Sequence, residues 1–396
     1  MGVDTTGRIE PCRLDRFSPE LADQLAQVPA EARVLGSRLH SRTAESLADL
    51  VRVMNCYYSN LIEGHDTRPR DIERALRADL DGQPDRRNLQ LEAAAHIRVQ
   101  REIDRQAAAG VLADPASVDF IVWLHREFYA GAPESMLTIG AGDRAFRMEP
   151  GRFRSSPQHD VAVGRHQPPA SDRVDELMSY FAGRFRSEGQ GPAEQLVSLA
   201  AAHHRLNYIH PFPDGNGRVS RLMSHAMAHR AGIGAHGLWS VSRGLARGLA
   251  SRTEYKAMMD LADSPREGDL DGRVNLSARC LERFATWFLG TCLDQLRFMN
   301  ELFGFDRLVE RLGVLVTRES WAPRSLALLE EVLLRGELAR GEAQRITGLP
   351  ERSARELLAR LVQNGILASA TPKGPVSLRV TIASAEALFP KLFPET

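Results

Sequence analysis

The chain has 396 residues, of which 43% are apolar and 26% charged, a composition typical of a globular protein with room for two or three domains. Lys plus Arg and Asp plus Glu number 51 each, so no overall charge indicates a nucleic-acid or membrane partner. The four cysteines lack the paired spacing of a zinc site, and no apolar run approaches the roughly 20 residues of a membrane helix. Because the N-terminus also lacks a signal-peptide pattern, we expect a soluble, cytoplasmic protein with reduced thiols.

Helical periodicity dominates the first three quarters of the chain. Apolar residues recur at three- and four-residue spacing, and alanine, leucine, arginine and glutamate are frequent. The clearest predicted helices span residues 46–64, 88–106, 117–131 and 193–210. After an N-terminal segment at 1–44, the pattern predicts an all-α domain over about 45–300.

One stretch within this domain departs from the helical pattern. Residues 140–170 are rich in glycine, proline and arginine, and residues 161–163 form a short strand candidate. The flanking residues favour a small β-hairpin or extended flap at about 155–168. Arg165 and His166 in this flap could contact a substrate, and a solvated loop is equally compatible with the pattern.

The chain changes character again near residue 320. Three short helical patterns separated by glycines lead into an alternating stretch around Lys373. Helix, helix-turn-helix and β-hairpin in this order predict a winged-helix domain over 320–396. Arginines in its helix at 350–364 suit phosphate contacts on DNA, but glutamates in the same helix offset their charge. Docking of a target protein or formation of a homodimer is the alternative.

The segment HPFPDGNGRVSR, from His210 to Arg221, carries the most information about chemistry. Asp-Gly-Asn-Gly alone is typical of a hairpin turn, but both flanks have helical spacing, so we predict a helix–loop–helix. Gly215 and Gly217 allow the backbone to turn its N–H groups inward, which makes an anion nest at the N-terminus of the second helix. Arg218 and Arg221 are three residues apart, so both lie on one helix face beside this nest.

Other residues of the segment complete a predicted triphosphate site. Asn216 adds side-chain donors, and Asp214 places a carboxylate where it could hold Mg²⁺ against phosphate oxygens. The imidazole of His210 is a natural base for a protein hydroxyl that attacks phosphorus. Phe212 lies between two prolines and is expected to bury its ring and hold the loop in the core. The pattern therefore predicts nucleotide chemistry.

The segment resembles the Fic family, because it matches every defined position of the motif H-x-F-x-[DE]-G-N-G-R-x-x-R. The resemblance covers about residues 45–290 and implies an α-helical enzyme that transfers a nucleoside monophosphate, most often AMP from Mg-ATP, to a Ser, Thr or Tyr hydroxyl of a target protein. It implies that His210 is the general base and that Asp214 coordinates Mg²⁺. It assigns the α- and β-phosphates to Gly215, Asn216, Gly217 and Arg218, and the γ-phosphate to Arg221.

The resemblance also implies that the flap aligns the target protein by strand addition. The related Doc kinases carry Ala-Asn-Lys in place of Gly-Asn-Gly, which argues against phosphorylation.

A second pattern, Ser59-Asn-Leu-Ile-Glu63-Gly64, ends the predicted helix at about 45–64. From the residues alone, Glu63 is a solvated glutamate before a C-capping glycine. The segment also resembles the inhibitory-helix pattern [ST]-x-x-x-E-[GN] of many Fic proteins, which implies a pair between Glu63 and Arg221. A carboxylate there removes a γ-phosphate contact and repels the phosphate, so we expect an autoinhibited adenylyltransferase.

Several alternatives stay open. Tyr255 resembles a position at which family members line the adenine pocket, although ordinary helix packing also accounts for it. His203 and His204 are adjacent on one helix and cannot face one metal together, so core or polar-face positions are expected. The enzyme could also, or mainly, remove AMP, or a winged-helix DNA-binding regulator could use the Fic domain as a nucleotide sensor. An intact His210 favours catalysis, because a sensor needs the anion nest but not the base.

Overall fold

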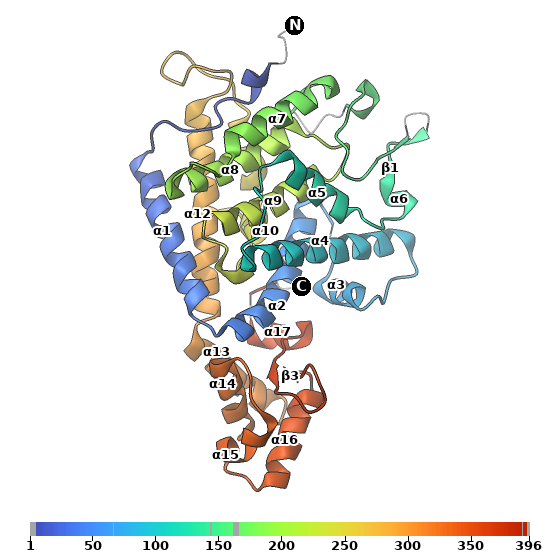
Figure 1. Cartoon of the computed structure of the whole chain (residues 1–396), viewed down its shortest axis with the longest axis vertical. Helices are drawn as coiled ribbons and strands as arrows, with labels where there is room; N and C mark the ends of the chain where they lie inside the picture. The colour runs from blue at the N-terminus through green and yellow to red at the C-terminus, as the bar shows by residue number, and fades with distance from the viewer. Residues whose placement is uncertain (1–4, 66, 143–144, 161–165, 390, 394–396) are drawn as a thin grey trace. The chain divides into compact units, whose positions relative to one another are not determined.

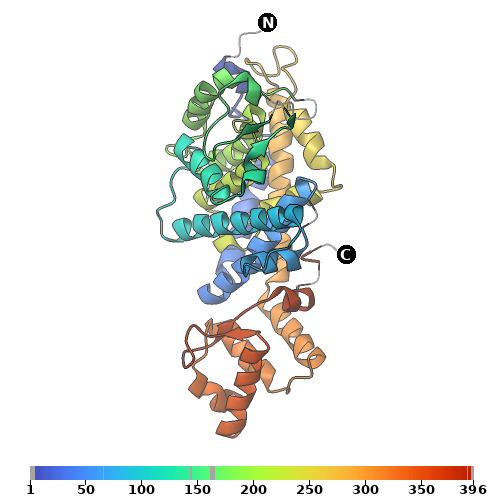
Figure 2. The same cartoon turned by 90° about the vertical axis from the view of Figure 1, so that its right-hand side faces the viewer.

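The structure is a computed structural model that describes residues 5–65, 67–142, 145–160, 166–389 and 391–393. It is mostly helical with small two-stranded sheets, which confirms the helical character expected from the sequence (Figures 1 and 2). The chain divides into one compact unit of residues 1–30, 55–234 and 240–295 and a second of residues 31–54, 235–239 and 296–396. None of the described helices is long and apolar enough to span a membrane.

The first unit contains most of the helices (Figure 1). They are α3 (Pro69–Leu76), α4 (Pro84–Ala108), α5 (Val118–Phe128), α6 (Glu134–Leu137), α7 (Val174–Phe185), α8 (Pro192–Ile209), α9 (Asn216–Arg230), α10 (Val241–Arg247) and α11 (Glu254–Ala262). Three long helices belong partly to each unit, namely α1 (Pro19–Ser37), α2 (Ser41–Ile62) and α12 (Ala278–Leu302).

Helices α8 and α9 pack on each other, and α9 also packs on α4 and α5. Helix α8 begins with Pro192, whose missing N–H costs nothing in the first turn, and the Glu194 carboxylate accepts the Gly191 N–H at 2.8 Å. Helix α9 is buried along almost its whole length, polar residues included. The helix that begins inside the predicted motif is therefore held by neighbours rather than lying on the surface.

A short antiparallel sheet lies in the glycine-rich part of this unit. Strand β1 (Thr138–Ile139) pairs with β2 (Phe146–Arg147), a pairing that the sequence pattern did not indicate. Of the expected flap, Pro157–His159 form a 3-10 turn, while Arg165 and the strand candidate at 161–163 lie outside the described residues.

The second unit holds α13 (Phe305–Arg318), α14 (Ser325–Arg335), α15 (Ala343–Thr347), α16 (Glu351–Gln363) and α17 (Ile382–Leu388). Strand β3 (Leu367–Ala368) pairs antiparallel with β4 (Ser377–Leu378), and Leu338 bridges to Val376. Leucines and valines of α14 and α16 fill the core between them. The winged-helix assignment of this part, and any DNA contact through it, stay predictions.

Candidate active site

The segment between α8 and the first turn of α9 has left-handed backbone at two residues. Side chains from elsewhere in the chain also lie close to two of its glycines. His210 follows α8 with φ 52° and ψ 59°, and Gly215 has φ +81°, a conformation that favours glycine. A Cβ on Gly215 would lie 2.8 Å from the Tyr129 hydroxyl, and one on Gly217 would lie 2.5 Å from Oε1 of Glu63. The two motif glycines therefore leave space for side chains from distant parts of the chain.

Phe212 and Asn216 make this loop rigid. The Phe212 ring is fully buried and stacks on the His125 imidazole, with 3.9 Å between ring centroids and 12° between planes. The Asn216 amide accepts the Phe212 N–H at 2.9 Å and donates to the Phe212 carbonyl at 2.7 Å. The sequence interpretation assigned the Asn216 donors to a phosphate and missed this use of the side chain to tie the loop to itself.

Arg154 holds the backbone at His210 from one side. Its Nε donates to the His210 carbonyl at 2.7 Å, and its Nη2 donates to the carbonyls of Ile209, at 3.1 Å, and Pro169. Its Nη1 pairs with Oδ1 of Asp160 at 2.7 Å, although the Arg154 side chain is fully buried. Since loss of this guanidinium would leave buried carbonyls without donors, Arg154 fixes the position of His210.

The His210 imidazole is neutral at ordinary pH. Burial lowers the pKa of His210 to about 4, and the positive charge of Arg154 acts in the same direction. His166 is held in place, because its Nε2 donates to the Tyr208 carbonyl at 2.8 Å and its Nδ1 lies 3.0 Å from an oxygen of Asp263. A neutral imidazole held in a fixed backbone position can accept a proton without first losing one.

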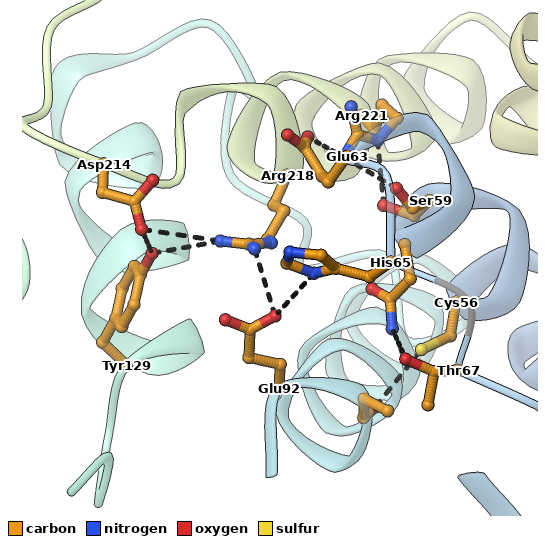
Figure 3. Close-up of polar contacts among 12 residues, drawn as sticks. Cys56, Ser59, Glu63, His65, Thr67, Glu92, Tyr129, Asp214, Arg218 and Arg221 are labelled. Carbon is orange, nitrogen blue, oxygen red and sulfur yellow. Dashed lines mark hydrogen bonds and ion pairs between the residues drawn. The ribbon is translucent and has the colours of Figure 1, made fainter. Parts of the chain in front are cut away.

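The Asp214 carboxylate, in the loop itself, faces Tyr129 and Arg218 (Figure 3). Its side chain is 49% exposed, and its Oδ2 accepts the Tyr129 hydroxyl at 2.8 Å. Burial acts to raise the pKa of Asp214, but the charge of Arg218 and the Tyr129 hydroxyl hold the pKa below its ordinary value. Asp214 is therefore ionised, and an ionised, accessible carboxylate fits the oxygen-ligand preference of Mg²⁺.

Arg218 is anchored by a glutamate that the sequence interpretation did not single out. Its Nη2 lies 3.1 Å from Oε2 of Glu92 on α4, its Nη1 lies 3.3 Å from the Tyr129 hydroxyl, and its guanidinium faces the Phe128 ring at 5.6 Å. The Glu92 and Arg218 side chains are only 12% and 7% exposed. Burial raises the pKa of Glu92, and the charge of Arg218 only partly opposes that effect.

Arg221 meets Glu63 and Ser59, as the close-up shows (Figure 3). Its buried Nη2 lies 2.6 Å from Oε1 of Glu63, and its Nε donates to Oγ of Ser59 at 2.9 Å. Glu63 directly follows α2, and Gly64 reverses the chain with φ +85°. Burial acts to raise the pKa of Glu63, but Arg221 and then Arg218 hold it below its ordinary value, so the pair is charged. The structure thus brings Ser59, Glu63 and Arg221 together.

Tyr255 belongs to a buried chain of hydrogen bonds. Its hydroxyl lies 2.8 Å from Nε2 of His203, whose Nδ1 lies 2.8 Å from Oγ of Ser224. Burial raises the pKa of Tyr255 to about 12 and lowers that of His203 to about 3, so both groups are neutral. His203 and His204 are fully buried, which confirms core positions for both. A contact of Tyr255 with an adenine ring stays a prediction.

Tyr129, Glu92 and Arg154 are the site residues that sequence reasoning missed. No spacing relates them to the loop, because they lie 56 or more residues before His210 or Asp214 along the chain. One signal was available for Glu92, since it belongs to a polar series at four-residue spacing with His96, Gln100 and Asp104, all on the same helix. Polar residues on the face that a helix buries indicate partners elsewhere in the fold.

Part of the chain is similar in sequence to proteins of a known family. Residues 115–228 match the model of the Fic/DOC family. The protein adenylyltransferase Fic of Nematostella vectensis is 31% identical over 147 residues, which cover 37% of this chain and 31% of that protein. Its namesake in Drosophila melanogaster is 30% identical over 183 residues, 46% of this chain and 32% of that protein. The chain therefore spans about a third of the length of these curated relatives.

A solved structure is similar over nearly the whole chain. The crystal structure of a Fic family protein from Desulfovibrio desulfuricans G20 aligns with a TM-score of 0.53 and 16% sequence identity, and the alignment covers 93% of this chain and 98% of that one. At this identity the likeness concerns the fold alone.

Proposed function

We propose, from the match of residues 115–228 to the Fic/DOC family model, that the chain is a protein adenylyltransferase that transfers AMP from Mg-ATP to a Ser, Thr or Tyr hydroxyl of a target protein. The observation that carries this proposal is His210 at the start of the glycine loop that leads to Arg218 and Arg221: Arg154 holds its backbone carbonyl, and its imidazole has a lowered pKa and is neutral. A nucleotide sensor would need the loop and the arginines but no base.

The residues for the nucleotide are those at the start of α9. The backbone N–H groups of Gly215, Asn216 and Gly217 lie at a helix N-terminus, where the helix dipole favours phosphate oxygens. Arg218 adds charge for the α- and β-phosphates and Arg221 for the γ-phosphate. Asp214 would hold Mg²⁺, which when bound neutralises and orients the phosphate oxygens.

The transfer step follows from the position of His210. The target hydroxyl oxygen forms a bond to the α-phosphorus as the bond between that phosphorus and the bridging oxygen to the β-phosphate breaks. The hydroxyl proton passes to the neutral His210 imidazole, and pyrophosphate leaves. The low pKa of His210 keeps the free enzyme in the proton-accepting form throughout the neutral range.

Glu63 is the proposed inhibitor of this reaction. Its Oε1 lies 2.6 Å from Nη2 of Arg221 and would be only 2.5 Å from a Cβ on Gly217, so the carboxylate lies against the first turn of α9. A negative charge there occupies Arg221 and repels an incoming γ-phosphate. The wild-type chain should therefore label its target weakly, and a weak assay of the wild type alone would not count against transferase activity.

The deciding experiment compares Glu63→Gly with the double variant Glu63→Gly/His210→Ala. Each is incubated with Mg-ATP and with a host lysate or itself as acceptor, and intact-mass and peptide mass spectrometry look for the addition of one AMP. We expect labelling by Glu63→Gly and a rate lower by about 10²- to 10⁴-fold in the double variant. Absence of AMP addition by Glu63→Gly, with folding verified by circular dichroism, would overturn the proposal.

A further inference from the structure

Helices α4 and α9 bring three ligand-type side chains together away from the nucleotide loop. His225 and His229 lie four residues apart on α9, and Asp104 lies on α4. Oδ1 of Asp104 is 2.6 Å from Nε2 of His225 and 2.9 Å from Nε2 of His229. Among the residues that the structure describes, this is the only group of three such side chains whose ligand atoms all lie within 4.8 Å of one another.

The cluster is buried and rigidly built. The side chains of Asp104 and His225 are 8% and 7% exposed, and that of His229 is 10% exposed. The His229 ring lies where a Cβ on Gly234 would be, 2.2 Å from its Nδ1, so a glycine at that position is needed to seat the imidazole.

The arrangement goes beyond an ordinary helix-to-helix hydrogen bond. A carboxylate oxygen accepts and does not donate, so each imidazole donates its Nε2–H to the same Oδ1 of Asp104. One donor would suffice to tie the two helices together. Two imidazole nitrogens that converge on a single carboxylate oxygen are instead arranged around one small volume, as metal ligands are.

We propose that Asp104, His225 and His229 bind a divalent transition-metal ion of the zinc class. Two imidazole nitrogens and one carboxylate oxygen suit Zn²⁺, Co²⁺ or Ni²⁺ rather than Mg²⁺. Metal–ligand bonds of about 2.0–2.2 Å place tetrahedral ligand atoms about 3.4 Å apart. Oδ1 of Asp104 is now 2.6 Å from Nε2 of His225 and 2.9 Å from Nε2 of His229, so each distance needs to increase by less than about 1 Å for an ion to bind. Each neutral imidazole would carry its hydrogen on Nδ1 and present Nε2 to the ion, with water as the fourth ligand.

Such an ion would link the helix that carries the nucleotide arginines to the helix that carries Glu92. His225 lies one turn beyond Arg221 on α9, and Asp104 lies three turns beyond Glu92 on α4. Binding at this site would stabilise the packing of α4 on α9, since an ion that binds only the folded chain raises its stability. The site is separate from Asp214, so its occupancy can be measured without any nucleotide chemistry.

The test uses the full chain expressed without a histidine tag, stripped with a chelator and titrated with Zn²⁺ by calorimetry, and with Co²⁺ while visible absorption is recorded. We expect one ion per chain and a visible absorption spectrum typical of four-coordinate Co²⁺. The bound ion should also raise the Tm, and a chelator should reverse that rise. His229→Gln and Asp104→Asn should each weaken binding by about 100-fold or more, since even outer-shell partners contribute about 10- to 100-fold.

His40→Gln provides the matched control, because His40 is exposed and lies outside the cluster. It should bind Zn²⁺ as the wild type does. Circular dichroism of each metal-free variant separates loss of ligand from loss of fold, and the wild-type Co²⁺ spectrum tests the site even where a variant does not fold. No tight ion in the wild type, or an unchanged affinity in folded His229→Gln, would show that the cluster is only a hydrogen-bonded contact and overturn the proposal.

Discussion

The two arginines at the start of α9 each meet a glutamate, but the two pairs differ in construction. Glu92 lies within the long helix α4, with its side chain 12% exposed, and burial raises its pKa. Glu63 lies just beyond the end of α2, with its side chain 32% exposed, and its pKa is lowered by Arg221 and Arg218 against the effect of burial. A carboxylate at a helix end can leave by a local change of backbone, whereas one inside a packed helix cannot.

The different positions of Glu92 and Glu63 indicate different roles, although each glutamate makes the same kind of contact with an arginine. The pair of Glu92 and Arg218 is a permanent part of the fold that sets the orientation of the guanidinium. In the proposed function, the pair of Glu63 and Arg221 would compete with the phosphate and could be withdrawn. This distinction predicts that loss of the Glu63 carboxylate raises activity and loss of the Glu92 carboxylate lowers it.

The largest effect is expected for Glu63. Glu63→Gly should raise the rate of AMP transfer by about 10- to 100-fold. This change corresponds to about 1.4 to 2.8 kcal/mol by which the Glu63 carboxylate opposes productive ATP binding. The rate is measured with radiolabelled ATP under initial-rate conditions. Glu63→Gln keeps the size of the side chain and tests whether charge is responsible. Glu45→Gln, at an exposed glutamate of α2, serves as the control. Equal rates in Glu63→Gly and wild type would remove the inhibitory role.

A smaller and opposite effect is expected for Glu92. In the Glu63→Gly background, Glu92→Gln should lower kcat/KM for ATP by about 3- to 10-fold, because Arg218 loses a charged partner worth about 1 kcal/mol in orienting it. Most of the change should lie in KM. The comparison between the two pairs fails if Glu92→Gln alone activates the enzyme as Glu63→Gly does, since both carboxylates would then be inhibitory.

A weaker release is expected from Ser59. Ser59→Ala removes the Oγ that accepts the Nε–H of Arg221 at 2.9 Å but leaves Glu63 in place. The loss of one hydrogen bond, about 1 kcal/mol, should weaken the inhibited arrangement and raise transfer by about 2- to 5-fold. Ser59→Thr, which keeps the hydroxyl, is the control. An unchanged rate in Ser59→Ala would assign the inhibition to the Glu63 carboxylate alone.

The smallest effect is expected from pH. His210 has a pKa of about 4 in place of 6.5, so the imidazole is neutral above that value and loses its basic form only as pH falls through it. In Glu63→Gly, kcat/KM should therefore change by less than about 2-fold between about pH 6 and pH 8. The pKa of Glu63 is lowered, so the charged pair with Arg221 persists over the same range in the wild type. A fall in kcat/KM centred near pH 6.5 would contradict the lowered pKa of His210.

Much of the local structure could be predicted because it depends on short-range patterns. The helix–loop–helix around Gly215 follows from glycines between two helical patterns, and the burial of Phe212 follows from an aromatic ring between prolines. The strands β1 and β2 were missed because each has only two residues, too short for a period-two signal.

The chemical residues of the loop, from His210 to Arg221, and the pattern around Glu63 could be recognised in the sequence by itself, because backbone turns, helix ends and side-chain spacing are set within about a dozen residues. Only the tertiary structure decided what each of these groups meets. Arg154 on the backbone of His210, Tyr129 on Asp214 and Glu92 on Arg218 come from separate helices and loops. The physical reason is burial: charge pairing, hydrogen bonding and pKa depend on which groups share a water-poor volume, and only the packing of helices distant in sequence determines that.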